Sequence, residues 1–149
     1  MKFGKWGVFT FTDIMGAEQL SDLCSRVEGA GYSTLWYPEA MNYETFGIGA
    51  FLLSNSNNLV VASGIANIYA RDPSASVMGH NTLNSLYGGR FVLGLGVSHA
   101  PIVSELRGHD YKRPVATMRA YLDDMDKAWE SFGGADTSKQ VVLAALART

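Results

Sequence analysis

The sequence is poor in cysteine, in charge and in long apolar runs. Its single cysteine, Cys24, can form neither an internal disulfide nor a cysteine metal cage. The longest apolar run covers residues 47–53, whereas a membrane-spanning helix needs about 20 apolar residues. Residues 1–6 carry positive charge, but no clean apolar stretch of a secretory signal follows them. We therefore expect a soluble cytoplasmic protein that does not bind a membrane.

Charged residues are scarce and nearly balanced in sign. They make up 17% of the chain against a typical value of about 25%, and 12 Lys and Arg face 14 Asp and Glu. Nucleic-acid binding needs a clustered basic face, and the densest basic spot is only the pair Lys112 and Arg113. Hydrophobic residues account for 47%, so the chain can offset its ordering entropy and disorder is excluded. A length of 149 residues predicts a single domain, 1–149.

Apolar, β-rich segments alternate with segments of helical character along the chain. Helices are predicted at 20–30, 44–54, 73–87 and 114–129. The strand candidate 59–68 is apolar almost without alternation, which is typical of a parallel strand covered on both faces. Four β-α units followed by a last strand predict a parallel sheet with right-handed crossovers. The five predicted strands are 6–10, 34–37, 59–68, 91–97 and 140–144.

Several helix ends carry their own sequence signals. Asp72 followed by Pro73 has the form of an N-cap and a first helical residue. Gly31 is placed to end the first helix, and Gly88 with Gly89 to end the third. The polar segment that follows the fourth strand, up to Arg113, is predicted to be a loop. The predicted buried stripe of the fourth helix consists of Val115, Met118, Leu122, Met125 and Trp129.

Two architectures fit this order of elements: a doubly wound open sheet and part of a (β/α)8 barrel. A dinucleotide-binding fold is disfavoured, because the motif begun by Gly94 and Gly96 needs a third glycine where His99 stands. The two glycines instead indicate a place where another chain segment or a flat ligand approaches the strand closely. The sequence also lacks the phosphate-binding loop of ATP-dependent phosphoryl transfer.

A few residues are candidates for chemistry because of where they follow predicted strands. His99 comes directly after the fourth strand, and Glu39 holds the matching position after the second. Barrel and open-sheet enzymes place their reactive groups at these carboxyl ends. The glycine within 63–67 indicates either a bulge against a ligand or close helix packing. Arg71 is left open between an exposed ion pair, a neighbour of a helix cap and an anion contact, and the three histidines lack metal-ligand spacing.

Three linked segments carry a resemblance to a known family. Residues 89–101 resemble the fourth-strand signature of the bacterial luciferase-like flavin and deazaflavin monooxygenases. Residues 35–40 and 62–73 are similar to the second and third strands of the same family, and 107–109 and 113–122 continue the match. The nearest branch is described as coenzyme F420-dependent oxidoreductases. The resemblance covers essentially the whole chain in order.

The resemblance implies a TIM-barrel enzyme with coenzyme F420, or alternatively FMN, at the carboxyl ends of the strands. It implies hydride transfer between the deazaflavin and a small organic substrate, or monooxygenation in an FMN version. In relatives a non-prolyl cis peptide in the third strand backs the flavin ring, and Gly64–Ile65 matches that position. Glu39 and His99 match positions of active-site acid–base groups. The cofactor-binding residues implied are Ser63, Gly64, Ile65, Asn67, Gly96, Val97 and Ser98, with no metal ligand.

The chain departs from the family in length. Residues 141–146 match the fifth strand, and family members continue for three more strands and helices. We therefore expect a TIM-barrel-type fold truncated to about four βα units plus a fifth strand, with open strand edges. Such a half-barrel is expected to form a homodimer or to pair with another chain. The alternatives are a non-catalytic flavin-binding or vestigial half-barrel and a purely structural one.

Overall fold

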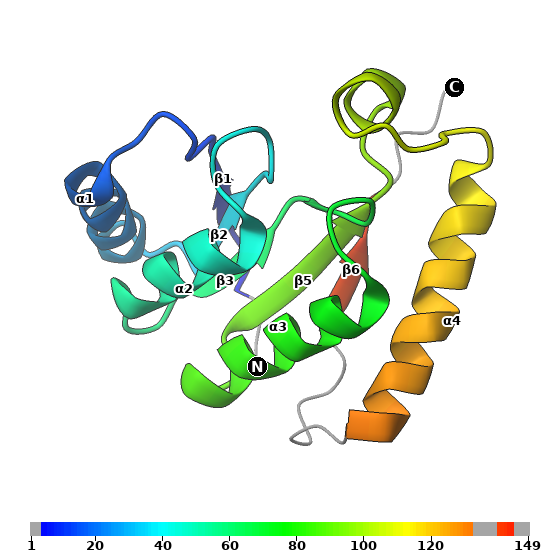
Figure 1. The fold of residues 1–149 in the computed structure, drawn as a ribbon. Helices are drawn as coiled ribbons and strands as arrows, with labels where there is room; N and C mark the ends of the chain where they lie inside the picture. The colour runs from blue at the N-terminus through cyan, green and yellow to red at the C-terminus, as the bar shows by residue number, and fades with distance from the viewer. Residues whose placement is uncertain (1–3, 133–139, 145–149) are drawn as a thin grey trace.

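The chain alternates strands and helices along its length (Figure 1). The computed structural model describes residues 4–132 and 140–144. The helices are α1 (Ala17–Gly29), α2 (Thr45–Ser54), α3 (Pro73–Leu86) and α4 (Pro114–Phe132), and a π-helical turn, η1, covers Ile102–Leu106. The strands are β1 (Gly7–Phe9), β2 (Thr34–Tyr37), β3 (Val60–Ser63), β4 (Ala66–Asn67), β5 (Phe91–Gly96) and β6 (Val141–Leu143).

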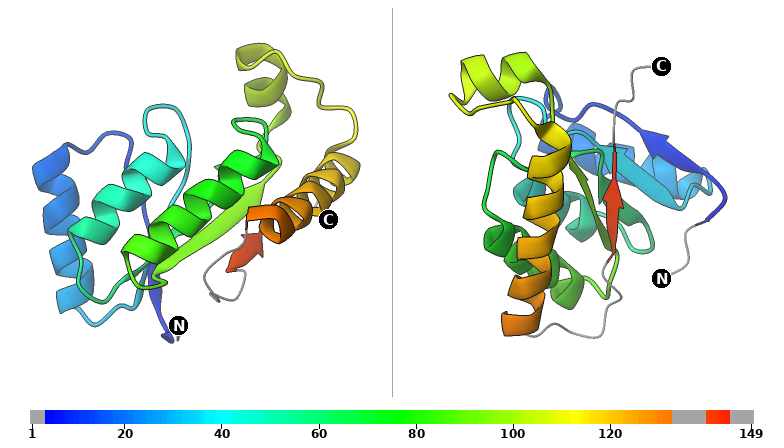
Figure 2. Two further views of the ribbon diagram at one scale, coloured as in Figure 1. Left: turned by 60° about the horizontal axis from the view of Figure 1, so that its bottom comes forward. Right: turned by 90° about the vertical axis from the view of Figure 1, so that its right-hand side faces the viewer.

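All strand pairings are parallel, as the alternation of elements predicts. β1 pairs with β2, β2 with β3, and β5 lies between β3 with β4 on one side and β6 on the other. The described helices cover one face of this sheet (Figures 1 and 2). Within the described residues, β1 and β6 each have a neighbouring strand on one side only. The sheet is therefore open at both edges there.

The main core lies between the sheet and its helices. Leu35, Tyr37 and Leu93 point from the strands into this layer and are fully buried. They meet Leu52 of α2 and Met125 of α4, both also fully buried. This arrangement accounts for the apolar character of the predicted strands, since alternate residues enter the helix-covered core.

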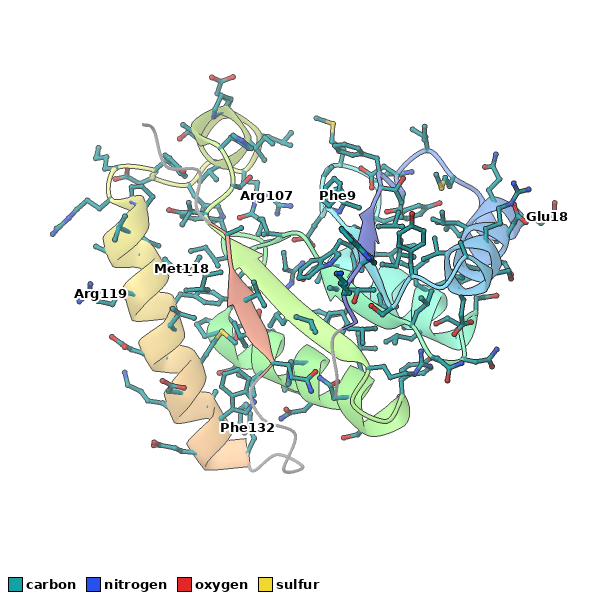
Figure 3. The ribbon with its side chains drawn as sticks, turned by 180° about the vertical axis from the view of Figure 1, so that it is seen from behind. Phe9, Glu18, Arg107, Met118, Arg119 and Phe132 are labelled. Atoms are coloured by element: carbon teal, nitrogen blue, oxygen red, sulfur yellow. The ribbon has the colours of Figure 1, made fainter. Side chains whose placement is uncertain are left out.

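The opposite face of the sheet carries a smaller apolar cluster. Val60, Ala62 and Val92 are buried there against Trp36. Phe9, which is opposite Trp36 in the strand register, is 55% exposed on this face (Figure 3). We call this surface the open face. No described helix covers it.

The predicted helix ends are confirmed. The Asp72 carboxylate accepts a hydrogen bond from the Ala75 amide at 2.8 Å and caps α3. Gly31 follows α1 with φ +81°, and Gly88 and Gly89 follow α3 with φ +63° and +74°. These left-handed conformations favour glycine, because other residues meet a Cβ clash there.

The strand predicted at 59–68 is present as β3 and β4, divided at the glycine that the sequence marks as an interruption. Two other predictions about local structure are wrong. The predicted loop after β5 contains η1. Val115 is 75% exposed, whereas Tyr121, Met125 and Ala128 are the buried residues of α4. The Tyr121 hydroxyl already meets the carbonyl of Asp72, which caps the start of α3. The first turn of α4 therefore extends past α3 and has no helix to pack against. The predicted fifth strand is confirmed at 141–143, while 145 and 146 lie outside the described residues.

His80 provides a test of packing between α3 and α4. Its ring is buried, lies edge-on to Trp129 at 5.6 Å, and Nε2 accepts from the Asn84 side-chain amide at 3.1 Å. Burial lowers the pKa of His80 below its ordinary 6.5, because the charged ring would lose its hydration. The unfolded chain then binds more protons than the folded one, so stability is expected to fall as pH drops through 6.5.

Urea unfolding at pH 7.5 and pH 5.5 measures this slope. A His80→Gln variant should be less stable at both pH values but should show a flatter dependence on pH, because glutamine does not titrate. An unchanged slope in His80→Gln would contradict the assignment.

No helix in the described part of the chain is long and apolar enough to cross a membrane.

Candidate functional site

A β-bulge interrupts the third strand of the sheet near its carboxyl end. Ala62 is opposite Val92 and Ala66 is opposite Leu95, so residues 63–65 face only residues 93–94. One extra residue is thus accommodated between β3 and β4, which defines the bulge. The peptide bond Gly64–Ile65 within it is cis. This confirms the bulge indicated by the glycine and the cis peptide implied by the family resemblance.

Ser63 replaces the sheet hydrogen bonds that the bulge interrupts. Its hydroxyl donates to the Gly94 carbonyl and accepts from the Gly94 amide, both at 2.9 Å. Because Ser63 is fully buried, these bonds satisfy backbone groups that would otherwise lack partners. The Ser63 side chain thus serves the backbone of β5.

The glycines of β5 make room for the bulge. A Cβ at Gly94 would lie 1.9 Å from the Ser63 carbonyl oxygen, and a Cβ at Gly96 would lie 2.6 Å from Ile65 Cγ1. The sequence left open whether a chain segment or a flat ligand comes close to β5 at these glycines. The structure places a chain segment there, the bulge at residues 63–65. Gly64 itself faces the open side, where a Cβ would lie 3.3 Å from the Phe9 ring.

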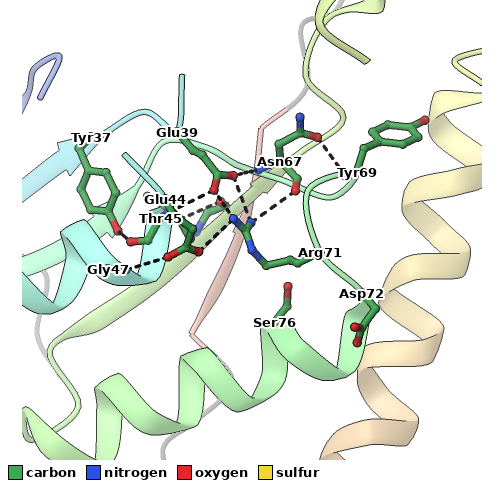
Figure 4. A network of polar contacts seen from close by, with 12 residues as sticks. Tyr37, Glu39, Glu44, Thr45, Gly47, Asn67, Tyr69, Arg71, Asp72 and Ser76 are labelled. Atoms are coloured by element: carbon green, nitrogen blue, oxygen red, sulfur yellow. Dashed lines mark hydrogen bonds and ion pairs between the residues drawn. The ribbon is translucent and has the colours of Figure 1, made fainter. Parts of the chain in front are cut away.

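The Glu39 carboxylate is buried in a network at the carboxyl edge of the sheet (Figure 4). Oε1 accepts from the Thr45 amide at 3.1 Å, and Oε2 accepts from the Asn67 amide at 2.8 Å. Arg71 adds one guanidinium nitrogen to each oxygen, Nη1 to Oε2 at 3.1 Å and Nη2 to Oε1. Both oxygens therefore accept two hydrogen bonds, which fills their lone-pair directions.

Arg71 is held from several sides. Nη2 also contacts Glu44 Oε1 at 3.1 Å, and the guanidinium lies over the Phe46 ring at 5.4 Å. The Tyr121 hydroxyl donates to the Arg71 carbonyl at 3.1 Å. Of the three roles considered for Arg71, the ion pair is the one observed. It is buried rather than exposed, since only 9% of the Arg71 side chain reaches solvent.

A cleft of about 230 Å³ opens beside this network. The Glu39–Arg71 pair forms one wall, and Arg107, which follows η1, forms another (Figure 3). Sequence reasoning missed Arg107 as a site residue, because it lies in a polar segment without periodicity. The remaining lining comes from Ala40, Met41, Asn42, Tyr43, Glu44 and Ala70.

His99 lies at the same edge of the sheet but does not line this cleft. It is exposed, and its carbonyl accepts from the Val103 amide at 3.0 Å, at the start of η1. The preceding Ser98 has φ +56°, an uncommon value for a residue other than glycine, and its carbonyl accepts from the Tyr111 hydroxyl at 3.1 Å. Val97 and Ser98 are half-buried. Strands β3 and β4 separate β2, which precedes Glu39, from β5, which precedes His99.

Sequence reasoning also missed an aromatic cluster beside β4. The ring of Tyr69 lies 5.8 Å from the ring of His109 and 6.1 Å from that of Tyr111. The Tyr69 hydroxyl is buried without a hydrogen-bond partner among the described residues. Tyr69 comes directly after the predicted strand 59–68, and this position at a strand end is the only sequence signal that could have marked it as a site residue.

Comparison with known proteins identifies the class of this fold and site. A family model described as luciferase-like monooxygenase matches residues 1–142. A Mycobacterium tuberculosis protein named as a coenzyme F420-dependent oxidoreductase is 29% identical over 87% of this chain and 35% of its own length. The chain belongs to the luciferase-like monooxygenase family.

Solved structures confirm the fold class. The F420-dependent tetrahydromethanopterin reductase of Methanopyrus kandleri matches 92% of this chain and 43% of its own, with a TM-score of 0.73 and 18% identity. A Pseudomonas putida type II Baeyer–Villiger monooxygenase in complex with FMN matches 76% and 35%, with a TM-score of 0.68 and 16% identity. The fold is thus of the TIM-barrel type, with a sheet that is open at both edges within the described residues. The chain spans less than half the length of each of these relatives.

The carboxyl edge has features that fit a flavin or deazaflavin. Three buried hydroxyls there, those of Thr12, Thr45 and Tyr69, have no hydrogen-bond partner among the described residues. Buried polar groups are normally paired, so each of these hydroxyls calls for a partner outside the described residues, such as ordered water or a ligand. On the open face, the exposed Phe9 ring lies against Gly64 and adds an apolar surface. A planar ring with polar substituents needs both an apolar surface and hydrogen-bond partners.

Proposed function

We propose that this chain is the cofactor-binding half of an F420- or flavin-dependent oxidoreductase. The observation that carries the proposal is the bulge at residues 63–65, near the carboxyl end of the third strand of the sheet. The buried hydroxyls of Thr12, Thr45 and Tyr69, which follow the carboxyl ends of strands and have no partner among the described residues, support it. The family to which the chain belongs gives independent support, because its named relatives use F420 or FMN.

The bound cofactor would accept or donate the hydride in a reaction with a small organic substrate. Gly64, Ile65 and Asn67 would support the ring from one side, and Val97 and Ser98 would border it from the end of β5. Gly96 would contribute indirectly, by leaving room for the Ile65 side chain that covers it. His99 is exposed at this edge and is our proposed proton-transfer group. A hydride leaving an alcohol carbon requires that the hydroxyl proton be taken up as well.

Coenzyme F420 is the favoured cofactor and FMN is the alternative. The Mycobacterium tuberculosis relative, at 29% identity, is named as F420-dependent. The Methanopyrus kandleri reductase, with a TM-score of 0.73, is also named as F420-dependent. The FMN-bound monooxygenase is similar in fold, so a test must include both molecules.

A fluorescence titration with F420 and, separately, with FMN tests this function. Saturable binding is expected, and Gly64→Ala should weaken it about tenfold, because the new methyl group would project toward the Phe9 ring on the open face. Gly29→Ala is the matched control, since nothing lies within 4 Å of a Cβ there. Saturable binding without turnover of any of a panel of small alcohols and aldehydes would favour the non-catalytic alternative. No binding of either molecule would contradict the proposal.

We also propose that a second copy or another chain covers the open face in the active protein. Phe9 and Val142 are exposed on the open face, and β1 and β6 have unpaired edges within the described residues. Analytical ultracentrifugation should show a dimer, and Phe9→Lys should shift it toward the monomer. A well-folded wild-type monomer that binds little hydrophobic dye would contradict this.

A further inference from the structure

The segment Ile65–Asn67 is held at both ends by a single residue. The Glu39 amide donates to the Ile65 carbonyl at 3.2 Å, and the Asn67 amide donates to Glu39 Oε2 at 2.8 Å. Both contacts join residues that are distant in the chain, so they connect the end of β2 to the segment that joins the bulge to β4. The position of this segment therefore depends on the orientation of the Glu39 side chain.

That orientation is fixed by groups from two other elements. The Thr45 amide, at the start of α2, donates to Oε1 at 3.1 Å. Arg71, which follows β4, contacts both carboxylate oxygens, and such a two-pronged pair fixes the plane of the carboxylate as well as its distance. Only 6% of the Glu39 side chain reaches solvent, so little water competes for these bonds.

Arg71 closes the arrangement on the segment itself. Its Nη1 donates to the Asn67 carbonyl at 3.4 Å, while Glu39 accepts from the amide of the same residue. Arg71 is in turn fixed by Glu44, by the Phe46 ring and by the Tyr121 hydroxyl on its carbonyl. Groups from α2 and from the ends of β2 and β4 thus converge on one ion pair (Figure 4), and Tyr121 of α4 holds the backbone of Arg71.

We propose that Glu39 and Arg71 are a positioning pair that holds residues 65–67 in the shape that receives the cofactor, and that Glu39 is not the proton-transfer group of the site. The second half follows from the contacts, because a carboxylate that already accepts four hydrogen bonds offers no lone pair to a substrate hydroxyl. Protonating Glu39 would also leave the buried Arg71 with a weaker partner. That residues 65–67 bind a cofactor rests on the proposed function. That Glu39 and Arg71 hold these residues in place does not depend on it.

The experiment compares Arg71→Met, Arg71→Lys, Glu39→Gln and the double variant Glu39→Gln/Arg71→Met with Asp72→Ala. Asp72→Ala removes the adjacent helix cap and lowers stability without touching the pair. Two quantities are measured on folded protein: amide hydrogen exchange at Asn67 and Thr45, and the dissociation constants for F420 and FMN.

Arg71→Met should accelerate exchange at both amides at least tenfold and weaken ligand binding at least tenfold, because an unpaired carboxylate is left buried. The double variant should recover part of both losses, because no unpaired carboxylate is left buried. The recovery is partial because the single carbonyl oxygen of glutamine replaces only one of the two carboxylate oxygens that accept from the Thr45 and Asn67 amides. The exchange and binding of Arg71→Lys should lie between those of the wild type and those of Arg71→Met, because an ammonium group cannot bond to both carboxylate oxygens in one plane as a guanidinium does. Asp72→Ala should leave both the exchange at the two amides and the dissociation constants unchanged, because it destabilises α3 without altering the Glu39–Arg71 pair.

Several results would overturn the proposal. The first is unchanged hydrogen exchange at Asn67 in Arg71→Met or, if that variant does not fold, in Arg71→Lys. The second is a double variant whose exchange and ligand binding are no closer to those of the wild type than those of Arg71→Met. Loss of turnover in Glu39→Gln with unaltered ligand binding and exchange would return Glu39 to the proton-transfer role. If the wild type binds neither F420 nor FMN, the proposed function fails, and the exchange at Asn67 still decides whether the pair positions the segment.

Discussion

Replacing Gly94 with alanine should destabilise the chain by about 3 kcal/mol or more, at the upper end of overpacking costs. The added Cβ would lie 1.9 Å from the Ser63 carbonyl oxygen, which belongs to the backbone of the bulge. That oxygen cannot rotate away. Relief requires β5 to separate from β3, which also breaks the two hydrogen bonds between Ser63 and Gly94.

Gly96→Ala is the matched comparison on the same strand. Its Cβ would lie 2.6 Å from Ile65 Cγ1, a side-chain atom that can move by a rotamer change. We expect a loss of about 1 kcal/mol, within the usual range for an extra buried methyl group. Urea unfolding followed by circular dichroism measures both variants. Equal losses at the two positions would show that the bulge does not approach β5 as described.

Arg90→Met should lower the free energy of unfolding by about 3 kcal/mol. The Arg90 guanidinium donates to the Leu59 carbonyl at 2.8 Å, the Leu53 carbonyl at 3.0 Å and the Ser56 carbonyl at 3.2 Å, and to the Ser56 hydroxyl at 3.1 Å. It thereby binds the Leu53 carbonyl at the end of α2, which has no partner within the helix, and the carbonyls of Ser56 and Leu59 in the segment that follows. Hydrogen bonds to charged groups contribute about 1.5–3 kcal/mol each, and these four share one side chain.

Arg90→Lys should recover only part of this loss, because an ammonium group cannot reach four acceptors in one plane. Arg26→Met is the control: its partner Asp22 is one turn away on the exposed side of α1, and such pairs contribute about 0.5 kcal/mol or less. Since Arg90 lies at the amino end of β5, ligand binding at the carboxyl edge should be unchanged in the folded variants. Thermal and urea unfolding of the wild type, Arg90→Met, Arg90→Lys and Arg26→Met measures these differences. Equal losses in Arg90→Met and Arg26→Met would contradict the role given to Arg90.

The sequence predicts the order of elements because local patterns determine them. Continuous apolar character at 91–97, the Asp72-Pro73 cap and the glycines after α1 and α3 each have one structural solution. Val115 shows the limit of such patterns. It continues a helical apolar stripe, yet whether a stripe is buried depends on how far the neighbouring helix extends.

The site was predictable only in part, and for a related reason. The bulge has a local marker, a glycine inside an apolar strand. The Glu39–Arg71 pair has none, because the partners of Glu39 include Asn67 and Arg71, 28 and 32 residues away along the chain, and they come together only through the parallel strand order. Sequence position alone therefore predicted Glu39 as an acid–base group, while the hydrogen bonds around it favour a positioning role.

The central claim is that the bulge and the neighbouring end of β5 bind the ring of F420 or FMN. Amide hydrogen exchange of the wild-type chain, with and without a saturating concentration of each molecule, tests it most directly. The account predicts protection concentrated at residues 64–69 and 96–99. Protection instead at the 370 Å³ groove lined by Asp72, Lys127 and Phe132, or at neither place, would contradict it.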